Sequence, residues 1–343
     1  MPLTAGLREF LAKQPLGLGG APLGNLYRAI SDEAAVTLVR HAWRIGVRYF
    51  DTAPHYGNGL SEQRMGAVLG DMPRDSFVLS TKVGRLLQRE PGAPSTQHGY
   101  VDVPPLVQSY DYSRDGVLRS LAGSQRRMGL ARIDIVYVHD LDRATHGSEF
   151  DGHFRALLES GLPALAELKS AGVIDGYGIG VNGVDICMET LRHADLDVIL
   201  LAGRYTLADQ SALPELLPEC VRRAVTVVLG GPFNSGILAT GTQPADRTTP
   251  LFDYAPASTA MVAHVAAIEE TCRAFDVPLP AAALQFAAAH PAVAVVLAGA
   301  RTVDEVDGNI AAMRLPIPVP FWEALRGRGL VALAAPLPAG VAS

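Results

Sequence analysis

Short apolar runs recur along the chain, and each is followed by a stretch whose apolar positions repeat with helical spacing. Continuous apolar runs of this length indicate strands that are buried on both faces, as in a parallel sheet covered by helices. We expect strands within LGLGGA near residue 16, VRYFDT at 47, FVLSTK at 77, IDIVYVHD at 133, GYGIGVN at 176, DVILLAG at 197, VTVVLGG at 225 and VAVVLAGA at 293.

The helical spacing predicts a helix after most of these strands, with Ser31 and Ser113 as N-cap candidates for two of them. The predicted helices are 32–45, 60–70, 113–129, 160–171, 184–194, 212–224, 260–275, 279–290 and 303–313.

Eight strands that alternate with helices predict a (β/α)8 TIM barrel with long active-site loops. A doubly wound sheet is less suitable, because LGLGGAPLG lacks the glycine spacing of a dinucleotide-binding turn. We therefore expect a single barrel domain over 1–343. Two long connections, 83–112 and 231–258, are expected to carry function, since long loops in compact domains usually do.

Composition and charge narrow the classes of protein. The 343 residues are 48% hydrophobic and 19% charged, which is typical of a globular chain, and the net charge of -6 argues against nucleic acid as the main partner. The three cysteines are far apart and form no metal-binding pattern. No signal peptide or membrane span is indicated, so we expect a cytoplasmic protein. The apolar segment LVALAAPLPAGVAS at the end is expected to pack on the surface, where it could serve a homo-oligomer contact.

Polar side chains stand where several predicted strands end. Asp51 follows the second strand, Lys82 the third, His139 and Asp140 the fourth, and Asn182 the fifth. In a barrel the carboxyl ends of the strands meet on one face, which is where such enzymes carry their chemistry. For any one of these residues, a solvated strand end is an equally simple interpretation.

Lys82 is the most informative of these residues. The chain has 29 basic residues, of which only Lys13, Lys82 and Lys169 are lysines, so arginine would be expected wherever a solvated charge is enough. A lysine ammonium can be buried beside an anion, and Asp51 on the adjacent strand is the natural partner. The pair alone is also consistent with a structural salt bridge.

Tyr56 gives the pair a chemical use. A phenol has a pKa of about 10, and a nearby ammonium is expected to lower it enough for Tyr56 to exchange a proton. His139 could contact the same reacting oxygen. No GxSxG or HExxH motif is present, which argues against a serine hydrolase or a metalloprotease and predicts no metal site. Alcohol–carbonyl interconversion with a separate hydride carrier fits best.

These residues, in this order, resemble the aldo-keto reductase superfamily. RYFDTAPHYGNGLSEQRMG is similar to its signature segment, FVLSTKVG to its lysine strand and RIDIVYVHDLD to its histidine strand, and the likeness extends over about 14–315. The resemblance implies a catalytic tetrad of Asp51, Tyr56, Lys82 and His139 in a nicotinamide-dependent barrel.

The resemblance also implies a cofactor site. The residues expected to face the nicotinamide nucleotide are Asn182, Tyr205, Gly230, Gly231, Pro232, Phe233, Asn234, Gly236, Arg301, Thr302, Glu305 and Asn309. Gly230 and Ala202 depart from the family pattern, which commonly has a stacking aromatic residue and a glutamine there. The carboxylate of Glu305 would repel a 2′-phosphate and Arg301 would attract one; we expect NAD to be favoured over NADP.

The substrate expectation comes from a branch of the family that oxidises cyclic hemiacetals to lactones. APLGNLYRAISDE, HYGNGLSE and YDYSRDG resemble enzymes that act on L-fucose (D-threo-aldose) or on pyridoxal. A sugar is favoured because aromatic residues make up only 6% of the chain. The residues expected to bind its hydroxyl groups are Asn25, Tyr27, His55, Tyr112 and Asn234. A pyridoxal 4-dehydrogenase, a weakly active nicotinamide-binding interaction subunit and an aldose isomerase remain as alternatives.

Overall fold

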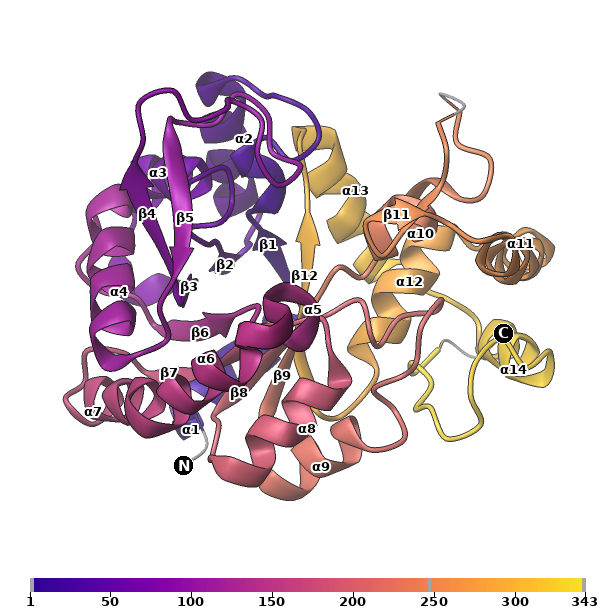
Figure 1. Ribbon diagram of the computed structural model, residues 1–343. Coiled ribbons are helices and arrows are strands. Elements are labelled where there is room, and N and C mark those ends of the chain that lie inside the picture. The colour runs from indigo at the N-terminus through magenta and orange to yellow at the C-terminus, as the bar shows by residue number, and fades with distance from the viewer. Residues whose placement is uncertain (1–2, 246–247, 341–343) are drawn as a thin grey trace.

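Eight parallel strands close into one barrel in a computed structural model that describes residues 3–245 and 248–340 (Figure 1). Around the barrel the strands follow the order β1-β12-β9-β8-β7-β6-β3-β2. All eight coincide with predicted runs, so the (β/α)8 barrel is confirmed. Their bounds are Leu16–Gly19 (β1), Tyr49–Asp51 (β2), Val78–Val83 (β3), Ile135–His139 (β6), Gly176–Val181 (β7), Val198–Ala202 (β8), Thr226–Gly230 (β9) and Val293–Gly299 (β12).

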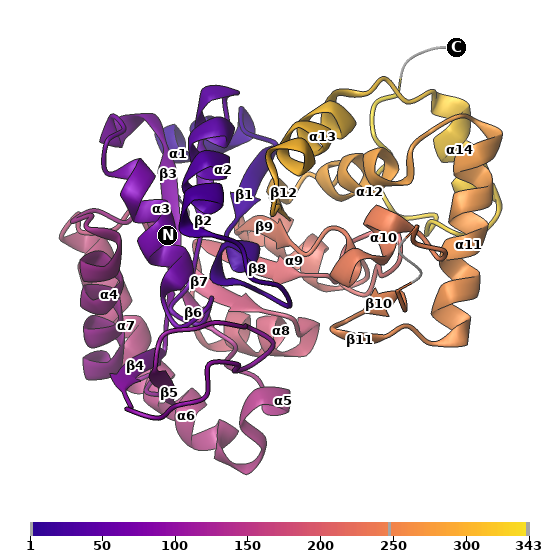
Figure 2. The same ribbon diagram turned by 90° about the horizontal axis from the view of Figure 1, so that it is seen from above.

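Helices surround the barrel, as Figure 2 shows from above. Both predicted caps form: the Ser31 hydroxyl accepts from the Ala34 N–H, and the Ser113 hydroxyl from the Gly116 N–H. The main helices are Asp32–Arg44 (α2), Leu60–Leu69 (α3), Arg114–Met128 (α4), Leu162–Ser170 (α7), Val184–His193 (α8), Leu216–Arg223 (α9), Thr259–Ala274 (α11), Leu279–Ala288 (α12) and Val303–Arg314 (α13).

One predicted helix is shorter than expected. The spacing predicted a helix from residue 212, but α9 begins at Leu216 after a turn. Pro218 accounts for the difference, because proline has no N–H and is tolerated in a helix only within its first turn.

Several elements were not predicted. The connection 83–112 contains an antiparallel hairpin of β4 (Arg85–Arg89) and β5 (Leu106–Tyr110), and 231–258 contains a smaller one of β10 (Leu251–Phe252) and β11 (Ala255–Pro256). Residues 246–247 of the second connection lie outside the described residues. The unpredicted helices are α1 (Ala5–Ala12), α5 (Arg143–His146), α6 (Phe150–Ala156), α10 (Ile237–Thr240) and α14 (Val319–Gly327), and a π-helical segment, Leu157–Gly161, joins α6 to α7.

The C-terminal segment lies partly on the surface and partly in the core. Leu330, Val331 and Ala335 are buried in the main core, whereas Leu333 is 82% exposed. Residues 341–343 lie outside the described part. The expectation of surface packing thus holds for most of the described segment, whereas its three buried residues reach the core; Arg326 of α14 donates to the Ala335 carbonyl at 2.6 Å.

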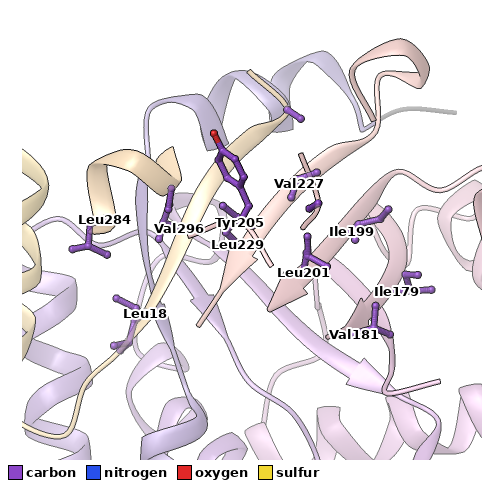
Figure 3. Packing of buried hydrophobic residues seen from close by; sticks show 14 of the residues in the cluster. Leu18, Ile179, Val181, Ile199, Leu201, Tyr205, Val227, Leu229, Leu284 and Val296 are labelled. Atoms are coloured by element: carbon purple, nitrogen blue, oxygen red, sulfur yellow. The ribbon is translucent and has the colours of Figure 1, made fainter. Parts of the chain in front are cut away.

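The hydrophobic core has two layers. The larger lies between the barrel and its helices, where Leu18, Ile199 and Val296 point outward from their strands (Figure 3). The smaller lies inside the barrel near the strand N-termini, where it is covered by Leu11 of α1 and by Leu3, two residues before that helix. That end of the barrel is consequently closed by apolar packing.

Candidate active site

Lys82 and Asp51 form a buried ion pair inside the barrel. The Lys82 ammonium donates to Asp51 Oδ2 at 2.7 Å and to the Thr52 carbonyl at 3.0 Å, and the lysine is only 1% exposed. Pairing of β2 with β3 sets Asp51 beside Ser80, whose hydroxyl donates to Asp51 Oδ1 at 2.7 Å. Both carboxylate oxygens therefore accept a hydrogen bond, as a buried charge requires.

Tyr56 and His139 lie directly beside this pair. The Tyr56 ring centroid is 4.5 Å from Lys82 Nζ, and the Tyr56 and His139 rings meet nearly edge to face at 6.0 Å. The structure thus brings the four predicted catalytic residues together at the carboxyl ends of β2, β3 and β6.

The protonation of Tyr56 differs from the sequence expectation. Burial raises the pKa of Tyr56 well above its usual value, and the negative charge of Asp51 raises it further. The expectation that Lys82 makes this phenol acidic is therefore wrong for the free protein. Tyr56 is a neutral phenol there, because desolvation of the phenolate outweighs the attraction of nearby cations.

His139 is neutral for a related reason. Burial lowers the pKa of His139 well below its usual value, and the charges of Arg85 and Lys82 lower it further. Its Nδ1 is buried and has no hydrogen-bond partner among the described residues. His139 is thus a neutral imidazole at the wall of the smaller cavity, with one buried nitrogen that has no partner among the described residues.

Two adjoining cavities meet at Tyr56. The larger cavity, of about 770 Å³, extends from Asp51 and Tyr56 to the start of α13. The smaller cavity, of about 430 Å³, is lined by Lys82, His139 and several aromatic rings. A further cavity of about 430 Å³, next to α1, contains none of the predicted site residues.

Most of the predicted cofactor residues line the larger cavity. Glu305 accepts from the Arg301 backbone N–H at 2.7 Å, and the Arg301 side chain donates to the Leu26 carbonyl at 3.1 Å. Asn182 lines the smaller cavity instead. The predicted residues along the larger cavity are Gly230, Gly231, Pro232, Phe233, Gly236, Arg301, Glu305 and Asn309.

Three predicted cofactor residues have structural contacts instead. Tyr205 is fully buried among the core residues of Figure 3. Its ring stacks on Phe286, and it lines neither cavity. The amide of Asn234 donates to the Gly203 carbonyl at 3.0 Å and accepts from the Thr206 hydroxyl. Thr302 caps α13 by accepting from the Glu305 N–H. None of the three lines either of these two cavities, so their contact with the cofactor stays a prediction.

The predicted substrate residues divide in the same way. Tyr27 and His55 line the smaller cavity. Asn25 is buried and accepts from Arg64 Nη1 at 2.8 Å, while the Tyr112 hydroxyl donates to the His139 carbonyl at 2.9 Å beneath the site. Neither Asn25 nor Tyr112 reaches the cavity, because a strand-end position in the sequence does not reveal the direction of the side chain.

Other residues of the smaller cavity were not predicted. Tyr100 stacks near Tyr56 with ring centroids 6.2 Å apart, His98 lies beside His55, and Tyr254 borders both cavities. They come from the two long connections, whose length was the only signal in the sequence. Among the described residues, no cluster of His, Cys, Asp and Glu could hold a metal ion, and no helix is long and apolar enough to cross a membrane.

Comparison with known protein families identifies the family to which this barrel belongs. The family model described as "Aldo/keto reductase family" matches residues 15–327. The chain belongs to the aldo-keto reductase family. It is accordingly an NAD(P)-dependent oxidoreductase.

Among curated relatives of this aldo-keto reductase, a pyridoxal 4-dehydrogenase from Microbacterium luteolum is 41% identical, with 94% of this chain and 96% of that protein aligned. A D-threo-aldose 1-dehydrogenase from a Pseudomonas species is 40% identical, with 94% and 95% aligned. An aldo-keto reductase structure from Bacillus halodurans in its holo form superposes with a TM-score of 0.70 at 26% identity, covering 92% of each chain.

The larger cavity fits the nicotinamide nucleotide that this family uses. Arg301 lines it, and the Arg301 Nε is buried without a hydrogen-bond partner among the described residues, which suits an anionic ligand nearby. Gly231 and Gly236 have positive φ angles of 59° and 110°, so backbone rather than side chains forms this wall.

His55, at the wall of the smaller cavity, makes the free energy of unfolding depend on pH. Burial lowers the pKa of His55 to about 3, whereas in the unfolded chain it is about 6.5. The unfolded state thus binds more protons between these values, and stability falls as pH drops below about 6.5. We expect His55→Gln, which can still bond Gln108, to reduce the loss between pH 8 and pH 5 by about 1–2 kcal/mol.

Urea unfolding at the two pH values measures this difference. An equal loss of unfolding free energy in the wild type and in His55→Gln would show that His55 is not a buried neutral group.

Proposed function

We propose that this enzyme oxidises a cyclic hemiacetal to its lactone, with an aldose such as L-fucose (D-threo-aldose) as the first candidate substrate. The observation that carries the proposal is the buried Lys82–Asp51 pair beside Tyr56 and His139, at the junction of the two cavities. The site offers proton-exchanging groups around one position and, among the described residues, no cluster that could hold a metal ion.

In the proposed reaction the hemiacetal loses two hydrogens, one as a hydride from the anomeric carbon and one as a proton from the hydroxyl. A bound oxidised nicotinamide would supply the hydride acceptor. Tyr56 takes the proton of the anomeric hydroxyl, and His139 gives that oxygen a second polar contact. Only the deprotonated form of Tyr56 can take this proton, and the phenol is neutral in the free protein. The rate of oxidation should therefore increase as pH rises.

An aldose suits the mixture of groups in the smaller cavity. Aromatic faces can pack against the C–H groups of a sugar ring, while Asn182, His55 and Tyr27 provide hydrogen-bonding atoms around its edge. The similarity to a D-threo-aldose 1-dehydrogenase supports the same choice.

Pyridoxal is the second candidate, favoured by the rings around this cavity. The chain is poor in aromatic residues, yet Tyr56, Tyr100, His55 and His98 gather here. That cluster weakens the compositional argument against a flat heteroaromatic ring. The similarity to a pyridoxal 4-dehydrogenase gives it equal support from the comparisons.

We further propose NAD as the preferred cofactor. The Glu305 carboxylate lines the larger cavity, where it would repel a 2′-phosphate. The Arg301 guanidinium, which would attract that phosphate, already donates to the Leu26 carbonyl.

A substrate screen tests the proposed reaction. We expect NADH formation with L-fucose, D-arabinose or L-galactose, and a slower or equal rate with pyridoxal, with the lactone identified by mass spectrometry. A higher kcat/KM with pyridoxal would reverse the order of the two candidates. Cofactor binding without oxidation of any of these compounds would contradict the proposal and favour a binding role.

Tyr56→Phe serves as the control for this screen. It should lower kcat by about 10²–10⁴-fold while NAD affinity stays nearly unchanged, because the hydroxyl acts on the proton in the transition state. Turnover that persists in this variant would come from another site or a contaminant.

Replacing Glu305 tests the cofactor preference. Glu305→Gln keeps an acceptor for the Arg301 N–H but removes the negative charge. We expect the ratio of kcat/KM with NADP to kcat/KM with NAD to rise by about 10-fold, equivalent to about 1.4 kcal/mol.

Asp304→Asn is the matched control. Asp304 occupies the same first turn of α13, is exposed and does not line the cavity. An equal change in both variants would indicate a general effect of charge at this helix end and would remove Glu305 as the selecting residue.

A further inference from the structure

A second buried ion pair lies on the other side of His139. Arg85 Nη2 donates to Asp140 Oδ2 at 2.6 Å, and the same carboxylate oxygen is 3.4 Å from His139 Nε2. Arg85 is only 5% exposed, and the Asp140 side chain is about three-quarters buried. The proposed reaction uses neither residue directly, and neither was assigned a role from the sequence.

The hairpin of β4 and β5 holds Arg85 in place. Arg85 Nη1 donates to the Tyr110 hydroxyl at 2.8 Å and to Gln108 Oε1 at 3.0 Å, and both partners lie on β5. Gln108 also contacts His55 Nδ1 at 3.0 Å. The unpredicted hairpin therefore connects His55 of the cavity wall, through Gln108, with the guanidinium that bonds Asp140.

Asp140 has an unusual backbone that turns the chain at the end of β6. Its φ angle is 46°, in the left-handed region, where aspartate is among the better-tolerated residues. Its N–H donates to the Gly180 carbonyl at 3.0 Å, which ties the turn to β7. The carboxylate is thereby placed between Arg85 and His139 at the wall of the smaller cavity.

We propose that Arg85 is a positioning residue that compensates the charge of Asp140 and so keeps the imidazole of His139 neutral, with Nε2 directed at Asp140. The effect of Arg85 on the reaction rests on the proposed function, whereas its effect on His139 can be measured without turnover.

The other groups around His139 support this balance. Lys82 faces it from β3, and His55 and Tyr56 face it from the segment after β2. Lys82 is matched by Asp51, as Arg85 is matched by Asp140. Tyr112, before α4, donates its hydrogen bond to the His139 backbone carbonyl and not to the imidazole ring. Loss of Arg85 would leave an unmatched carboxylate beside the imidazole.

Neutralising Arg85 should make the His139–Asp140 pair take up a proton. Burial lowers the pKa of His139, and Arg85 is the largest charged contributor in the same direction. Removing the guanidinium ends that contribution and leaves the carboxylate to stabilise an imidazolium, so both effects favour protonation.

Nuclear magnetic resonance of the imidazole C–H signals tests this directly on the full chain without ligand. The chain has nine histidines, and the His139 signal is assigned by its loss in His139→Asn. We expect it not to titrate between about pH 5 and pH 9 in the wild type and to titrate in Arg85→Gln. In the double variant Arg85→Gln/Asp140→Asn the titration should disappear again.

The rate profile provides the second measurement. In Arg85→Gln, kcat/KM should fall by a further tenfold per pH unit, relative to the wild type, below about the new apparent pKa of His139, and the double variant should lack this additional fall. Arg85→Lys, which keeps the charge, should show the wild-type profile. If no variant oxidises any substrate but the imidazole titrates as expected, the positioning role stands and the proposed function fails.

Arg74→Gln controls for the general loss of a buried ion pair. Arg74 bonds Asp134 at 2.6 Å, and neither residue lines the two cavities of the site. It should change stability without altering the His139 signal. The proposal is overturned if His139 fails to titrate in folded Arg85→Gln, if it titrates equally in Arg74→Gln, or if the double variant retains the titration.

Discussion

The buried contact between the Lys82 ammonium and the Asp51 carboxylate is the constraint on which the rest of the site depends. Two charges removed from water are costly unless their geometry is good and their remaining hydrogen-bonding capacity is satisfied. Here Ser80 and Thr52 complete the bonding of the pair. Because apolar packing closes the other end of the barrel, the pair faces the cavities at the carboxyl ends of the strands.

Charge compensation is repeated across the cavity. Arg85 and Asp140 form a second pair, and His139 lies between the two pairs as a neutral ring. The neutral Tyr56 phenol completes a site whose buried charges are matched. Such a site can exchange one proton with a substrate without leaving an unpaired buried charge in the free protein.

The strands, and the meeting of Asp51, Tyr56, Lys82 and His139, were predictable because each depends on local sequence. An apolar run sets a strand, and parallel strands place their last residues on one face. The direction in which the side chains of Tyr205, Asn25 and Tyr112 point depends on tertiary packing, which the spacing of residues in the sequence does not predict. The pairing of β4 with β5 joins residues far apart, so neither the hairpin nor the pairing of Arg85 with Asp140 was expected.

The single-turnover rate of hydride transfer in a double-mutant cycle of Asp51→Asn and Lys82→Met tests this dependence most directly. If the two residues act as one unit, the double variant should be about as slow as the slower single variant. Rate losses that multiply in the double variant would show that Asp51 and Lys82 act independently, and would contradict the role of the ion pair.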